Sequence, residues 1–306
     1  MVTQHIVSIG WWSLGVILLW RSAYGQVVVP LGASEAELWR RAQVSALEQA
    51  RQKADGQVAV ELECQWRWLQ AWQPGTLGEQ PLLARDDLPK YHPEPALDPQ
   101  GMVAELRERL LGSEAKPTIA DTRRLKGLLE EHGDDWGVRQ LHLQWLDQPV
   151  YRKQYADQIA DAAQYLAERL AVDVDQDERV KWAAAWAWYR CGRALAYREL
   201  PDVVADRPLP DSDAHDGRLR YVWQQLRDLV GEDRPEFVLL QIRMLRRDGF
   251  LGQALVKLEE FGRAVDRKWL LKKRRDLLRE LHWEWPATEA ASVLEARFPE
   301  FAEQAN

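Results

Sequence analysis

The chain has 306 residues, of which 46% are apolar and 29% charged, and its formal net charge is −7 at pH 7. These proportions are ordinary for a folded protein, and the length suffices for one elongated domain or two compact ones. The negative balance argues against a generic nucleic-acid binder. The sixteen Trp residues are unusual. Most of them fall in helical patterns, so we expect them to pack between helices rather than to line a partner-facing groove.

The first 25 residues are predicted to be a targeting segment, a signal peptide or an anchor, rather than part of the fold. Residues 6–20 form an uncharged, largely apolar run, shorter than the roughly 20 residues that span a bilayer. Small residues precede a cut before Gln26, which is typical of a cleavable secretory signal. The chain is therefore predicted to be exported, to the periplasm or the exterior. The alternative is an uncleaved membrane anchor, because Arg21 directly follows the run and no Lys or Arg precedes it.

Residues 26–73 are predicted to form an N-terminal helical hairpin. The first helix covers residues 34–54, where Ser34 is a suitable cap and an apolar stripe follows. The second run, residues 58–72, fits two patterns. Its apolar residues alternate as in a strand, but its length and its many Gln, Glu, Ala and Leu residues favour a helix.

Residues 74–100 contain six prolines and are predicted to form a Pro-rich linker. Proline at this density cannot continue a helix. The simplest interpretation is a connection over the surface. The alternative is an extended strap laid along a groove.

Helical patterns resume at residue 101, so residues 101–306 are predicted to form one helical repeat domain. Residues 182–189 are apolar on nearly every side, which is typical of a helix in the middle of a packed structure. Loops are expected over residues 173–178 and 201–217. The helices expected before residue 235 cover residues 102–111, 119–131, 136–145, 151–170, 179–200 and 218–230.

The most regular stretch of the chain is residues 235–301. An apolar helical run, residues 237–245, leads into a turn at Gly249, and a second amphipathic helix follows. A helix, a tight turn and a second helix make a hairpin that cannot bury both of its faces alone. The pattern therefore predicts that such hairpins stack.

This pattern resembles the tetratricopeptide repeat (TPR), a helix–turn–helix unit of about 34 residues. Gly249 stands at the turn, Ala254 in the small-residue position, and Leu258 in the large position that follows. Ala290 and Leu294 repeat the small-then-large pair in the next unit. A small side chain allows two helices to approach closely, and a large one fills the gap to the next unit.

A weaker echo lies at Gly133, between the helices expected at residues 119–131 and 136–145. The resemblance implies an all-α fold of stacked antiparallel helical hairpins, a TPR-like superhelix (α-solenoid). It also implies a concave face that binds protein or peptide segments. A generic α-helical solenoid is the alternative.

No catalytic or metal-binding constellation is evident in the sequence: there is no glycine-rich phosphate loop, no nucleophile elbow, and the six His residues are scattered. Acidic clusters at residues 173–177 and 211–216 have the Asp rhythm of a calcium loop but lack its Gly and closing Glu in register. We expect Asp177 to cap a helix instead. Cys64 and Cys191 are predicted to be buried thiols, with one disulfide as the alternative. No catalytic residue, metal or cofactor is predicted.

One basic run, interleaved with a Trp, is the predicted partner-binding patch. A solvated helix face, paired with nearby acidic residues, is the alternative. The patch is suited to an acidic surface. Its residues are Arg267, Lys268, Trp269, Lys272, Lys273, Arg274 and Arg275.

The predicted function is that of a non-catalytic scaffold or adaptor, which binds protein or peptide partners through a helical-repeat surface. Nucleic acid is not expected as a partner, and contact with a membrane is expected only through residues 6–20 if they are retained. Two alternatives stay open. One is a helical-toroid enzyme that acts on cell-envelope polysaccharide, with carboxylates drawn from separate helices. The other is a membrane-anchored structural subunit of a larger complex.

Overall fold

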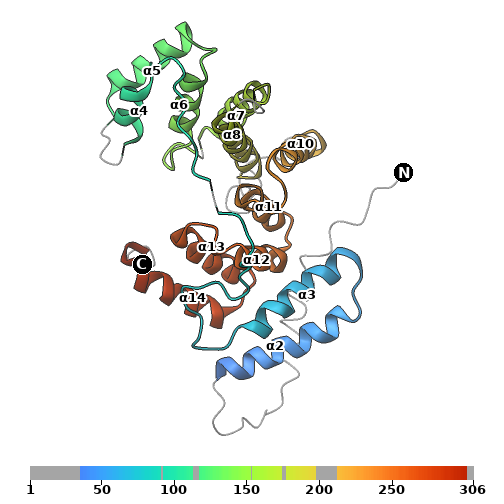
Figure 1. Ribbon diagram of the computed structural model, residues 1–306. Coiled ribbons are helices and arrows are strands. Elements are labelled where there is room, and N and C mark those ends of the chain that lie inside the picture. The colour runs from blue at the N-terminus through green and yellow to red at the C-terminus, as the bar shows by residue number, and fades with distance from the viewer. Residues whose placement is uncertain are drawn as a thin grey trace. The chain divides into compact units, whose positions relative to one another are not determined.

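The computed structural model describes residues 35–90, 92–112, 117–152, 154–173, 177–197 and 212–301. Every regular element in these ranges is helical, which confirms the predicted all-α fold class (Figure 1). The predicted targeting segment, residues 1–25, lies outside the described ranges. Among the residues that are described, no helix is long and apolar enough to cross a bilayer.

The chain divides into two compact units, residues 1–42 and 43–306, and the border falls inside α2 (Glu35–Arg51). In the first unit, the Glu37 carboxylate accepts a hydrogen bond from Arg40 Nε at 2.8 Å. Hydrogen bonds from Arg40 and Arg41, and the charges of these two guanidinium groups, lower the pKa of Glu37 to about 2. All the other helices lie in the second unit.

The ambiguous run at residues 58–72 is a helix, α3 (Gly56–Ala71), as its composition favoured. Trp68 and Trp72 are fully buried, whereas Val58 is 46% exposed. The strand-like alternation of apolar residues therefore does not correspond to a buried face. Trp68 and the capping Trp72 pack in the interior, as predicted, whereas Trp66 is half-buried.

Both cysteines are free thiols, so no disulfide joins them. Cys191 is buried as predicted, and Cys64 is only half-buried. Burial raises the pKa of the Cys64 thiol to about 11 and that of Cys191 to about 12. Neither thiol is therefore an activated nucleophile.

Beyond residue 101 the expected helices form, with two corrections. The helix expected over residues 151–170 begins only at Ala156, since Tyr151, Arg152 and Tyr155 lie in turns. The loop expected at residues 201–217 is shorter than predicted, because a helix begins at Ser212. Ser and Asp, which are frequent in this stretch, favour the first residues of a helix. Residues 198–211 lie outside the described chain. The remaining elements are α4 (Ala104–Leu111), α5 (Ile119–Glu131), α6 (Trp136–Leu146), α7 (Ala156–Leu170), α8 (Glu178–Tyr197), α10 (Ser212–Val230), α11 (Pro235–Arg247), α12 (Leu251–Glu260), α13 (Arg267–Glu280), α14 (Glu284–Arg297) and the short 3₁₀ helix η1 (Pro299–Phe301).

Helix α8 is the central buried helix that its apolar run predicted. It packs against α7, α10 and α11. Trp182, Trp186 and Trp188 are each at most 8% exposed. Asp177 caps the helix as expected, since its carboxylate accepts a hydrogen bond from the Arg179 N–H at 2.7 Å.

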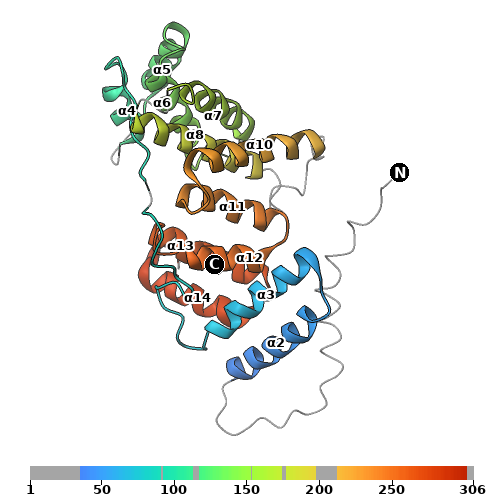
Figure 2. The ribbon, with the colours of Figure 1, turned by 45° about the vertical axis from the view of Figure 1, so that its right-hand side comes forward.

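The corner between α11 and α12 has the turn that Gly249 predicted, with φ of 82° at this residue. Few residues other than Gly adopt this conformation without strain. Ala254 and Leu258 are buried, and so are Ala290 and Leu294 in the next hairpin. Figure 2 shows α8, α11 and α12 one below the other.

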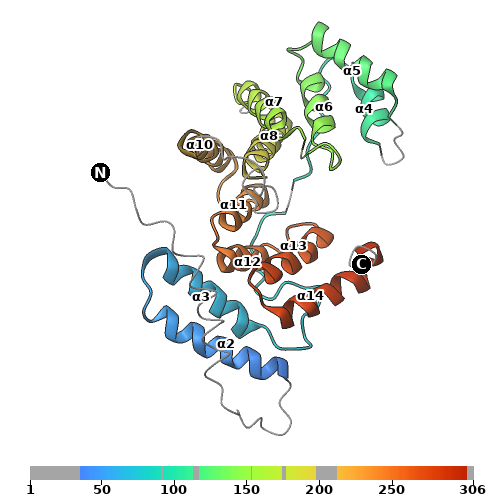
Figure 3. The same ribbon diagram turned by 180° about the vertical axis from the view of Figure 1, so that it is seen from behind.

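Helix α3 packs against α12, although the two helices are far apart in the sequence (Figure 3). Its Glu61 carboxylate accepts hydrogen bonds from the Gly252 N–H and, at 2.9 Å, from the Gln253 N–H. These N–H groups open α12 and have no partner inside that helix. A Cβ atom on Gly252 would lie 2.8 Å from Glu61 Oε1, so α3 approaches closely only because this residue is glycine. No feature of the sequence predicted this pairing.

Residues 74–100, apart from the undescribed Tyr91, form an extended strap, which was the alternative interpretation. The strap runs from α14 back to α4, against the chain order of the helices it passes (Figure 2). Side chains of α14, α12, α11 and α6 accept hydrogen bonds from its backbone N–H groups. The segment is thus bonded to the helices along its length.

Candidate partner-binding site

The predicted partner-binding patch lies on α13, but its seven residues do not share a face. Successive residues of a helix point in directions about 100° apart, so a run of neighbouring residues surrounds the axis. The structure accordingly places the seven in three different environments.

Arg274 is fully buried and is unavailable to a partner, which corrects its assignment to the patch. Its guanidinium donates two hydrogen bonds to the Glu259 carboxylate, at 2.7 and 2.8 Å. It also donates to the carbonyls of Gly78 and Gln80 in the strap, each at 2.9 Å. Arg274 is therefore a structural residue that joins α12, α13 and the strap.

Three other patch residues face the end of the chain. Lys268, Lys272 and Arg275 surround the ring of Phe301 in η1. Lys268 also forms a salt bridge with Glu300 at 2.6 Å. Lys268 and Lys272 are exposed and Arg275 is 14% exposed, and this side of α13 already has an occupant from the same chain. Three patch residues remain, of which Arg267 donates to the Glu79 carbonyl at 2.5 Å and Trp269 is half-buried.

Lys273 points to a third environment, toward α11. Burial, together with the charges of the nearby Arg243 and Arg246, lowers its pKa to about 8. An ammonium group whose pKa falls in this way is short of carboxylates. Lys273 thus leads to a group of cations that sequence reasoning missed.

Three arginines of this group converge on one carboxylate, Asp147, at the end of α6. Arg152 Nε lies 3.0 Å from Asp147 Oδ1, Arg190 Nε lies 2.9 Å from Asp147 Oδ2, and Arg193 bonds to Oδ1 as well. Among the described residues, Arg190 alone of the three has a second carboxylate, Glu94, which it holds with two bonds of 2.5 and 2.6 Å. Within this part of the chain, Arg152 and Arg193 therefore share a single negative charge.

Arg243 on α11 has even less negative charge near its guanidinium group than Arg152 and Arg193 have. It forms a hydrogen bond with Tyr189 on α8, and its Nε is buried without a hydrogen-bond partner among the described residues. Burial lowers the pKa of Arg243, and the neighbouring Arg193 and Arg152 lower it further. The guanidinium of Arg193 lies over the Tyr189 ring, 5.5 Å from its centroid. Arg243 and Arg193 thus meet at Tyr189.

We call these six cations the basic cluster: Arg152, Arg190, Arg193, Arg243, Arg246 and Lys273. The described side chains offer them the carboxylates of Glu94, Asp147, Glu280 and Asp276. Arg246 pairs with Glu280 and has a further interaction, so it is left out of the charge balance. The other five cations outnumber the three remaining carboxylates of the described side chains, and the Arg193 side chain is 12% exposed and that of Arg152 is 29% exposed. Carboxylates or phosphates are the groups that such guanidinium forks bind.

Sequence reasoning missed the basic cluster because its members come from four separated segments of the chain. The one available signal was Arg190 and Arg193, which interrupt the apolar run of α8. A charged residue inside a buried helix requires a partner, and the sequence does not show which other residues face it.

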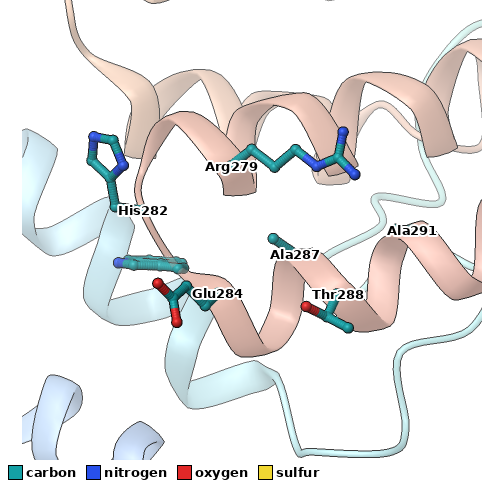
Figure 4. Close-up of a pocket in the computed structure, with 7 residues that line it drawn as sticks. Arg279, His282, Glu284, Ala287, Thr288 and Ala291 are labelled. Atoms are coloured by element: carbon teal, nitrogen blue, oxygen red, sulfur yellow. The ribbon is translucent and has the colours of Figure 1, made fainter. Parts of the chain in front are cut away.

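A hollow of about 350 Å³ lies between the end of α13 and α14. Figure 4 shows Arg279 reaching over Ala287 and Thr288, with His282 directed away from them. Trp283 also lines the hollow. Its charged groups do not converge on one point, so the hollow is a weaker candidate than the basic cluster.

Metal binding has no support in the described part of the chain, where no group of three or more His, Cys, Asp or Glu residues could hold an ion. Parts of both acidic clusters considered above, including Asp175 and Asp211, lie outside that part. Comparisons with protein-family models, curated proteins and solved structures gave no match to this chain.

Proposed function

We propose that the protein is a non-catalytic scaffold or adaptor, whose hairpins stack as a TPR-like superhelix and whose basic cluster binds an acidic segment of a protein partner. The observation that carries this proposal is the convergence of Arg152, Arg190 and Arg193 on the one carboxylate of Asp147, beside the incompletely bonded Arg243.

The charge arrangement favours binding over a purely structural role. Removing guanidinium groups from water is costly unless opposite charges compensate them. A structural network would contain one carboxylate for each cation, as Arg274 and Glu259 do in the interior. Here an incoming carboxylate would supply the missing charge, and the low exposure of the cations would strengthen its attraction.

The positions of the cations support a surface built by stacking. Side chains link alternate helices among those that the structure describes: Asp147 at the end of α6 with α8, Tyr189 of α8 with α11, and Arg246 of α11 with Glu280 of α13. In a stack of two-helix units, alternate helices form one layer. The basic cluster would then lie along that layer, where an extended acidic segment could contact several units.

The test is titration of the full chain with a labelled oligoglutamate peptide. The double variant Arg152→Gln/Arg243→Gln removes two cations and leaves Asp147 bonded to two arginines. We expect peptide affinity to fall about tenfold or more, with no loss of stability.

The matched control is Arg124→Gln on α5, where the arginine side chain is 46% exposed and lies near Glu105. It should leave the affinity unchanged. Equal affinities for the double variant and the natural chain would refute the proposal. The enzymatic and membrane-anchored alternatives have no comparable observation in their favour.

A further inference from the structure

Residues 298–301 fold back onto the side of α13 that carries Lys268 and Lys272. Phe298 follows α14, and η1 places Phe301 beside three cations of α13. The Phe301 ring centroid lies 5.1 Å from Lys268 Nζ, 5.6 Å from Lys272 Nζ and 6.0 Å from Arg275 Cζ. We call Lys268, Lys272 and Arg275 the α13 seat.

Two further contacts hold the same segment. Lys268 Nζ lies 5.6 Å from the centroid of Phe298, and it forms a salt bridge of 2.6 Å with Glu300. Two aromatic rings with a carboxylate between them thus occupy the α13 seat. A cation attracts the face of an aromatic ring and the charge of a carboxylate, so the seat matches both features of the segment.

We propose that the α13 seat is a docking surface for a short partner segment that carries aromatic side chains next to an acidic residue. Residues 298–301 occupy it in the free chain, and the partner segment displaces them. This surface is separate from the basic cluster, which lies toward α11.

Exposure of the contacts makes the displacement feasible. The side chains of Lys268 and Glu300 are 46% and 53% exposed, and ion pairs at such exposure contribute little. Lys272 has no carboxylate within salt-bridge distance among the described residues, so it can accept one from a partner. A tethered occupant competes at high effective concentration, which sets a threshold that a partner must exceed.

The experiment uses a labelled peptide that copies residues 294–301 and measures its binding to the full chain. In the double variant Phe298→Ala/Phe301→Ala, the tethered occupant is weakened. We expect the peptide to bind this variant about tenfold more tightly than the natural chain. Adding Lys268→Glu and Lys272→Glu should abolish binding, while adding Arg243→Gln in the basic cluster should not change it.

Any of three results with the peptide would overturn the proposal: no peptide binding to the double variant, binding that survives the two charge reversals, or binding of a peptide whose two Phe residues are Ala. Should the double variant fail to fold, Glu300→Lys weakens the occupant without removing an aromatic ring, and the same affinities apply. A dimer of the natural chain that Phe301→Ala dissociates would show that the occupant is a second copy, which also contradicts a partner segment. Oligoglutamate binding depends on Arg243, whereas binding of this peptide does not, so failure of one proposal leaves the other testable.

Discussion

The hairpins α11–α12 and α13–α14 differ from the strap in what holds them in place. The hairpins bury apolar side chains at helical spacing; Leu240, Leu255 and Leu294 have no exposed surface. Their backbone groups are bonded within the helices. The strap has no regular secondary structure, so its backbone groups require partners elsewhere.

Polar side chains of the helices supply those partners. Each of four helices offers an acceptor to a backbone N–H of the strap. Along the strap these pairs are Gly75 with Glu289 at 3.1 Å, Leu82 with Glu259 at 2.8 Å, His92 with Glu236 at 2.8 Å, and Leu97 with Gln140 at 2.8 Å. Glu236, Glu259 and Gln140 are fully buried. The same helices therefore pack on one another through apolar residues and hold the strap through polar ones, three glutamates and one glutamine.

The largest predicted effect is that of breaking the network at Arg274. Arg274→Met leaves the Glu259 carboxylate buried without its cation and removes the donors to two strap carbonyls. We expect the free energy of unfolding to fall by about 3–5 kcal/mol, since loss of one partner exposes the full desolvation cost of the other. Urea unfolding of the full chain measures this loss.

The matched control is Arg279→Met on the same helix, at an exposed position, which should change the stability by at most about 0.5 kcal/mol. Limited proteolysis with trypsin adds a local readout, because the strap contains Arg85 and Lys90. Cleavage there should accelerate in Arg274→Met and not in the control. A loss below about 1 kcal/mol with no faster cleavage would show that the network does not hold the strap.

A smaller effect is expected where α3 meets α12. Gly252→Ala adds a Cβ atom 2.8 Å from Glu61 Oε1, so the two helices must separate. The expected loss is about 1–3 kcal/mol, which is typical of overpacking. Gly127→Ala in α5 is the control: nothing lies within 4 Å of its Cβ position, and alanine should stabilise this helix by about 0.5–1 kcal/mol. If both variants were stabilised, close packing of α3 on α12 would be excluded.

The helices could be predicted from the sequence because their signals are local. Apolar spacing, the turn at Gly249 and the cap at Asp177 lie within the elements that they specify. The partner of α3 could not be predicted, because an apolar stripe shows that a face is buried and not which helix covers it. The hydrogen bond between Trp68 and Glu259 joins residues 191 positions apart.

The contacts of the strap and the residues of the site could not be predicted for a related reason. In an amphipathic pattern a buried acceptor such as Glu259 looks like any surface glutamate, so nothing in the sequence marked it. The patch on α13 contained a warning that was available, since consecutive basic residues such as Lys272, Lys273 and Arg274 must point in different directions. The cations of the basic cluster become neighbours only when α6, α8, α11 and α13 have packed.

The smallest effect separates two adjacent residues of α13. Arg274 is paired and stabilises the chain, whereas Lys273 faces Arg243 and Arg246, and its pKa is lowered to about 8 from 10.5, chiefly by burial. The folded chain therefore binds this proton less tightly than the unfolded chain does, so the charged Lys273 lowers the free energy of unfolding. This loss disappears as the pH rises from about 8 to 10.5 and the ammonium loses its proton. Lys273→Met should raise the free energy of unfolding at pH 7 by up to about 1 kcal/mol, and the difference from the natural chain should vanish near the upper end of that window.

The same substitution should weaken oligoglutamate binding at pH 7, because it removes a cation of the basic cluster. In the natural chain that affinity should decline above about pH 8, where Lys273 loses its charge. Lys126→Met is the control, since the Lys126 side chain is 78% exposed on α5 and should affect neither quantity. A variant at Lys273 that is less stable at pH 7 would show that this ammonium is well paired, and it would remove the contrast with Arg274. A variant that gains stability and loses affinity would show that the chain retains an unfavourable charge where an anion binds.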